Sequence, residues 1–144
     1  MSKIKPICIG VFTLLIGCMP YLFFRRRSLQ IFEWIRKTGI DPNKFCYHLN
    51  TKSTFANYIV FSLPTGLWIL SLSIILGVIW ADKSDQFTFY LTLFVFVAIS
   101  YEVMQYYQIL PGTFDSIDLI TIVAFYFIGI IFYKYRERRD KYEF

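Results

Sequence analysis

The sequence predicts an all-α protein, a multi-pass transmembrane bundle of about four helices with an amphipathic interfacial segment in the first loop. Of its 144 residues, 56% are hydrophobic and 21% are aromatic, whereas a soluble domain has about 45–50% apolar residues. The apolar residues gather in four long runs, and about 20 helical residues cross a hydrocarbon core of about 30 Å. We therefore expect a single transmembrane domain over residues 1–144.

The first predicted span covers about residues 4–24, and the arginine triplet at 25–27 ends it. Residues 15–18 read Leu-Ile-Gly-Cys, which fits the cleavage site of a bacterial lipoprotein with Cys18 as the acceptor. The apolar run continues past Cys18 to Phe24, and this favours an uncleaved span. The lipoprotein alternative stays open at this point.

The longest polar region, from about residue 28 to 57, forms the first loop. Part of it alternates apolar and charged residues, namely Leu29, Ile31, Phe32, Trp34 and Ile35 with Glu33, Arg36 and Lys37. This pattern predicts a short amphipathic helix at the membrane interface, ended by Gly39 and the Asp41-Pro42 pair. A connector packed over the bundle is the alternative.

The second predicted span covers about residues 58–80. Residues 62–66 read Ser-Leu-Pro-Thr-Gly and interrupt its early part. A proline inside a helix removes a backbone hydrogen bond. We therefore expect a kink there, or a regular span that begins only at Pro64.

The third span is expected over about residues 87–110 and the fourth over about 117–135, with a tight turn at 111–116 between them. Connections this short predict antiparallel neighbours. Residues 136–144 then form a basic tail.

The net charge of +5 comes largely from basic residues beside the apolar runs. Such clusters typically anchor spans at lipid head groups, so nucleic-acid binding is not expected. An even number of crossings places both termini on one side. Because the basic tail directly follows a span, we expect the termini to be cytoplasmic.

One polar cluster is expected at the end of the third and fourth spans. Glu102 lies within an apolar helix, where an ionisable group costs about 2.5–3.5 kcal/mol on insertion scales and usually faces protein or water. Gln105 follows one turn later, and Asp115 and Asp118 open the fourth span. The alternatives are that both aspartates only cap a helix and that Glu102 only links helices.

His48, the only histidine, lies in the first loop on the same predicted side as these acids. It is the fifth candidate ligand contact, although a lone loop histidine is more often simply solvated. Cys8, Cys18 and Cys46 lack the spacing of a metal site or disulfide framework. No hydrolase elbow, zinc helix or phosphate loop occurs, so no cofactor, metal or strong enzyme motif is predicted.

Two segments of the last third, Tyr101-Glu102-Val103-Met104-Gln105 and residues 111–119 (Pro-Gly-Thr-Phe-Asp-Ser-Ile-Asp-Leu), resemble the signature of VanZ-like membrane proteins. In that family a Glu-x-x-Gln ends the third span, and a Gly-Arg-x-x-Asp-x-x-Asp turn opens the last helix. The turn arginine is Thr113 here, and the asparagine of the last span is absent, with Thr121 the nearest polar residue.

The resemblance implies a bacterial cytoplasmic membrane and, in the founding members, resistance to the glycopeptide teicoplanin. The leading functional hypothesis is a cell-envelope protein whose acids recognise a polar or lipid-linked ligand at the outer leaflet. A non-catalytic accessory subunit that assembles with another membrane protein is the alternative. An enzyme that uses one carboxyl group as a general acid or base is the third.

Overall fold

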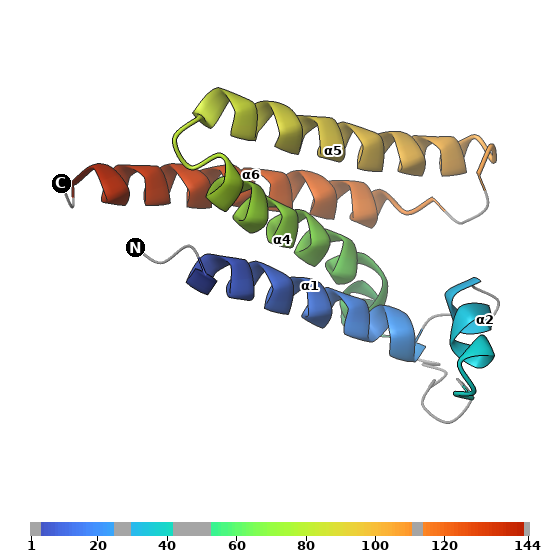
Figure 1. Ribbon diagram of the computed structural model, residues 1–144. Coiled ribbons are helices and arrows are strands. Elements are labelled where there is room, and N and C mark those ends of the chain that lie inside the picture. Colours follow the sequence, from blue (N-terminus) through green and yellow to red (C-terminus); the bar gives the residue numbers. More distant parts are fainter. Residues whose placement is uncertain (1–3, 25–29, 42–52, 111–113, 143–144) are drawn as a thin grey trace.

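The computed structural model describes residues 4–24, 30–41, 53–110 and 114–142, and every regular element in this part is a helix (Figure 1). The elements in chain order are α1 (Ile4–Phe24), α2 (Gln30–Lys37), α3 (Thr54–Asn57), the π-helix η2 (Tyr58–Ser62), α4 (Leu63–Ile79), α5 (Ser84–Tyr106) and α6 (Ser116–Tyr142). Four helical stretches are long and apolar enough to cross a membrane, namely α1, the continuous stretch Thr54–Ile79, α5 and α6. The all-α, four-helix prediction is confirmed.

α4 is the central helix of the bundle. It packs against α1 on one side and against α6 and α5 on the other, whereas α1 contacts only α4 and the adjoining η2 among the described elements (Figure 1). In the most apolar part of the span Thr54–Ile79, 50% of the residues are buried inside the bundle, whereas the corresponding share in α1 is 12%. The outward side chains of α1, α5 and α6 are mostly large and apolar, as expected for surfaces that face lipid.

The second span starts with an irregular turn, as the Ser-Leu-Pro-Thr-Gly sequence predicted. η2 covers Tyr58–Ser62, and the α-helix proper begins at Leu63 with Pro64 in its first turn. Pro64 has no N–H for the carbonyl oxygen of Val60, and its ring would crowd that oxygen in an α-helix. The wider π-helical turn accommodates this conflict without ending the span.

Small residues bring α4 and α6 close together. A Cβ atom on Gly66 would lie 2.5 Å from Cδ2 of Phe125, and one on Gly129 would collide with Ser73. Gly77 faces Tyr133 in the same way further along. These three contacts follow the same direction on both helices, so α4 and α6 are parallel. Such close approach through small residues is the usual means of helix association in membranes.

The turn between α4 and α5 is fixed by Tyr133 of α6. Its ring stacks on Phe87 with centroids 3.9 Å apart. Its hydroxyl lies 3.0 Å from the carbonyl oxygen of Trp80 and 3.2 Å from that of Ala81, and it donates to these acceptors. A buried cluster of Leu76, Phe87, Leu91 and Tyr133 surrounds this contact.

α5 ends at Tyr106, four residues before the predicted end of the third span. Gln108 adopts a left-handed backbone conformation with φ 57°. The N–H of Gln108 donates to the carbonyl oxygen of Gln105, and the N–H of Ile109 donates to the carbonyl oxygen of Met104. These two hydrogen bonds form a Schellman cap. Because Ile109 and Leu110 are apolar, the sequence pattern extended the predicted span beyond this cap.

α6 continues as a helix to Tyr142, beyond the predicted end of the span near residue 135. α2 forms over Gln30–Lys37 as an amphipathic helix, close to its predicted position. A turn at Thr38 and Gly39 ends it, where Gly39 has a φ of +83° and its N–H donates to the carbonyl oxygen of Arg36. The predicted stop at Gly39 is therefore confirmed.

Candidate functional site

Glu102 lies on the face of α5 that packs into the bundle. The buried residues of α5 are Phe87, Leu91, Val95 and Glu102, which recur at helical spacing along one stripe. The side chain of Glu102 is only 8% exposed, and its Oε2 atom is inaccessible to solvent. The sequence pattern correctly singled out this carboxyl group as one that faces protein rather than lipid.

The two aspartates at the start of α6 differ in their surroundings. Asp115 caps the helix, because its Oδ1 atom accepts a 2.9 Å hydrogen bond from the backbone N–H of Ile117. Asp118, one turn later, is 9% exposed, and its Oδ1 atom is inaccessible to solvent. The capping alternative therefore describes Asp115, whereas Asp118 points into the bundle.

The register of α5 and α6 brings Glu102 and Asp118 to the same level. The two helices are antiparallel, and the hydroxyls of Thr92 and Tyr126 share a 2.9 Å hydrogen bond between them. Val95 and Ile122 lie in one buried cluster next to this contact. Following both helices from there toward the end of α5 places Glu102 beside the first turns of α6.

Two more buried polar residues lie at this end of the bundle. Thr121 of α6 is 3% exposed and faces Gly66 of α4, where a Cβ atom would come within 2.8 Å of its Cγ2. Ser62 of η2 is 1% exposed and lies one turn before Gly66 on the helix that runs parallel to α6. It therefore lies at about the level of Asp118.

Sequence reasoning treated Ser62 only as part of a helix interruption, and Thr121 only as the nearest polar residue to a missing asparagine. Ser62 could have been recognised because it lies two residues before a proline in an apolar span. A proline there favours an irregular turn, and π-helical turns occur frequently at functional sites. We refer to the end of the bundle that carries four buried polar residues as the polar end; these residues are Ser62, Glu102, Asp118 and Thr121.

Two predicted residues, Gln105 and His48, remain. Gln105 lies in the last turn of α5 and is half-buried. His48 lies outside the described residues, so its position relative to the acids is still a prediction. Among the side chains that the structure describes, no three His, Cys, Asp or Glu residues come together as metal ligands would.

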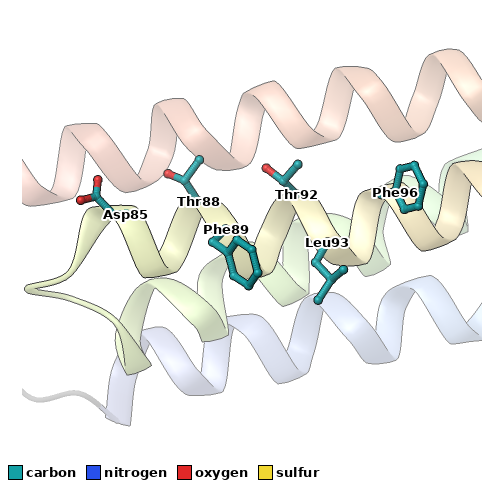
Figure 2. Close-up of a pocket in the computed structure, with 6 residues that line it drawn as sticks. All are labelled: Asp85, Thr88, Phe89, Thr92, Leu93 and Phe96. Atoms are coloured by element: carbon teal, nitrogen blue, oxygen red, sulfur yellow. The ribbon is translucent and has the colours of Figure 1, made fainter.

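A groove on the described surface lies elsewhere. It has a volume of about 580 Å³ and is lined by Asp85, Thr88, Phe89, Thr92, Leu93 and Phe96, which all belong to one face of α5 (Figure 2). None of these residues belongs to the buried stripe that carries Glu102, although Thr92 bonds to Tyr126 of α6. The groove is shallow and open to the surroundings of the bundle, so it contributes nothing to the polar end.

No family model, no curated protein and no solved structure matches this chain. The class of the protein is therefore defined by its fold alone, which is a helical bundle with four candidate membrane spans.

Proposed function

We propose that the polar end of the bundle recognises a polar or lipid-linked ligand at the outer leaflet of a bacterial cytoplasmic membrane. One observation carries the proposal. Two carboxyl groups from neighbouring spans, Glu102 and Asp118, are both buried at the same end of the bundle. Each is costly to place in an apolar environment, and residues of this kind usually mark functional sites in membrane proteins.

The chemistry of these groups indicates the class of ligand. Ionised carboxylates only accept hydrogen bonds, so the matching ligand carries donors such as sugar hydroxyls or ammonium groups. Ser62 and Thr121 add hydroxyls that both donate and accept. Because the site lies at one end of membrane-spanning helices, a lipid-linked molecule would reach it with its head group while its chains stay in the bilayer.

The resemblance to VanZ-like proteins agrees with this proposal but is not what carries it. Glu102, Gln105, Asp115 and Asp118 match the acidic and amide positions of that family's signature. Thr113 replaces a cation among these acids, which leaves the cluster more negative than in the family. A role in the cell envelope or in antibiotic resistance stays a hypothesis on this basis.

Native mass spectrometry of protein extracted from bacterial membranes in mild detergent tests the proposal. We expect the wild type to retain a bound lipid-sized molecule and the Glu102→Gln/Asp118→Asn variant to lose it. Asp82→Asn is the matched control, because Asp82 is an exposed acid at the opposite end of the bundle. Equal adducts on all three proteins would contradict ligand recognition, and failure of the double variant to accumulate would instead indicate a structural role for the acids.

The proposal also requires the polar end to face outward. After replacement of the native cysteines, Ser116→Cys should react with an impermeant maleimide on intact cells, whereas Ser84→Cys should react only after permeabilisation. Both serines are exposed and begin helices at opposite ends of the bundle. The reverse pattern would place the acids in the cytoplasm and exclude a ligand of the outer leaflet.

A non-catalytic accessory subunit is the second candidate, and the groove on α5 favours it. Phe89 and Phe96 are 64% and 67% exposed along this groove, with the hydroxyls of Thr88 and Thr92 beside them (Figure 2). A partner helix could pack its own side chains there. A photocrosslinker at Phe96 should then capture one stoichiometric membrane protein, whereas a crosslinker at Ile7 on α1 should not; lipid adducts alone would contradict this candidate.

A further inference from the structure

α2 is an amphipathic helix that no other described helix covers. Trp34 is 65% exposed, and the charged side chains of Glu33, Arg36 and Lys37 are exposed as well. α2 makes no packing contact with any other described helix, and in Figure 1 it lies beyond the end of α1. A connector packed over the bundle was the alternative for this segment, and the described contacts do not support it.

The chain connection keeps α2 close to the membrane surface. α1 ends at Phe24 and α2 begins at Gln30. At most about 3.6 Å per residue, the connection reaches about 22 Å. α1 carries no charged residue after Lys5 and is long enough to span the hydrocarbon core, so its last turn lies at a membrane surface. α2 is therefore held within reach of the lipid head groups there.

The positive charge in and before α2 favours a surface of anionic lipids. Arg36 and Lys37 occupy the last turn of α2, and the triplet Arg25, Arg26 and Arg27 precedes the helix in the sequence. Glu33 is the only acid between residues 25 and 37. A segment with this excess of positive charge is attracted to anionic lipids, and each basic residue near such a surface strengthens binding about fivefold.

Length provides a further argument. α2 has eight residues, and an isolated helix shorter than about 12–15 residues is marginal in water. No other described helix packs against α2, and a lipid surface would provide such support. An amphipathic helix gains that support when its apolar side enters the boundary between head groups and acyl chains.

We propose that α2 lies in the head-group layer at the C-terminal end of α1, with Trp34 inserted and with Arg36 and Lys37 on the phosphates of anionic lipids. The helix then acts as a lipid-binding anchor at the end of the bundle where Glu102 and Asp118 lie. This inference is independent of the proposed ligand, because it uses none of the residues of the polar end.

Site-directed spin labelling of the full chain in lipid nanodiscs tests it. In a variant without native cysteines, nitroxide labels are placed singly at Trp34→Cys and Arg36→Cys, which lie on nearly opposite sides of the helix. In nanodiscs that contain phosphatidylglycerol, the label at residue 34 should be accessible to oxygen and protected from an aqueous nickel reagent. The label at residue 36 should show the opposite pattern.

Two comparisons make the test specific. Arg36→Gln/Lys37→Gln, read by the label at residue 34, should weaken insertion about 25-fold, since each basic residue contributes about fivefold. Pure phosphatidylcholine should lower insertion similarly. A label at residue 34 that stays open to the nickel reagent in both lipids would overturn the proposal. Protection of this label from both oxygen and the nickel reagent would also overturn it, because it would show that protein covers this face.

Discussion

The hydroxyl of Ser71 donates a 2.7 Å hydrogen bond to the backbone carbonyl oxygen of Gly10, and this buried bond joins α4 to α1. It matters because α1 contacts no other long helix of the described bundle. Gly10 and Gly17 let α1 approach α4 closely, with Ile75 and Trp68 directly against them. The first span is therefore attached along a single seam, of which Ser71 is the polar part.

Ser71→Ala should weaken the attachment of α1. Hydrogen bonds between membrane helices contribute about 0.6 kcal/mol on average and about 1.7 kcal/mol at most, so we expect a loss in that range in the free energy of unfolding. Ser73→Ala is the control, because the Ser73 hydroxyl donates to the carbonyl oxygen of Ile69 within its own helix. Unfolding in mixed detergent, followed by circular dichroism, measures both; equal losses would show that the Gly10 contact has no special role.

Gly66→Ala should destabilise the seam between α4 and α6. The added Cβ atom would lie 2.5 Å from Phe125 and 2.8 Å from Thr121, closer than unstrained atoms allow. Overpacking of this kind costs about 1–3 kcal/mol, although alanine is the better helix former by about 1 kcal/mol.

The second change Phe125→Leu removes the ring that the new methyl group meets. We therefore expect the Gly66→Ala/Phe125→Leu protein to regain part of the lost thermal stability relative to Gly66→Ala alone. Additive losses would contradict the close contact.

Tyr133→Phe should loosen the turn between α4 and α5. It removes the hydroxyl that bonds to the carbonyl oxygens of Trp80 and Ala81 and keeps the ring that stacks on Phe87. A loss of about 0.5–1.5 kcal/mol is typical of one intramolecular hydrogen bond. Amide hydrogen exchange at residues 81–83 should accelerate. Tyr90→Phe provides the comparison, because its exposed ring stacks on Trp80; the same acceleration there would argue against a specific role for Tyr133.

Asp115 and Asp118 should respond differently to amide substitution. Asp115→Ala removes the cap of α6 and should cost about 0.5–2 kcal/mol, whereas Asp115→Asn keeps an oxygen for the N–H of Ile117 and should be close to neutral. If the negative charge of Asp115 is what matters, alanine and asparagine will be equally harmful in the unfolding measurement. Asp118→Asn leaves this cap intact, so its effect reports on the buried carboxyl group instead.

Much of the fold follows from the sequence because the bilayer sets simple requirements. A span needs a run of apolar residues of a certain length, and this fixed α1 at Ile4–Phe24 and the approximate positions of the other three spans. Charged residues inside such runs are conspicuous, so Glu102 was recognised. Gly39 stopped α2 as predicted, because its left-handed conformation suits glycine.

Other features depended on the tertiary structure. The predicted third span ran to Leu110, but a left-handed Gln108 ends α5 earlier, a conformation that a pattern of apolar residues does not reveal. The distinct surroundings of Asp115 and Asp118 also became visible only once α6 was placed.

The sequence by itself determined which segments enter the membrane, and only the tertiary structure decided which faces meet there. Lipid chains and packed helices are both apolar, so hydropathy cannot distinguish a face that contacts lipid from one that contacts another helix. Close packing at Gly66 and Gly129, and the register of α5 against α6, resolve that ambiguity. They bring Ser62, Glu102, Asp118 and Thr121, which are distant in the sequence, to one end of the bundle.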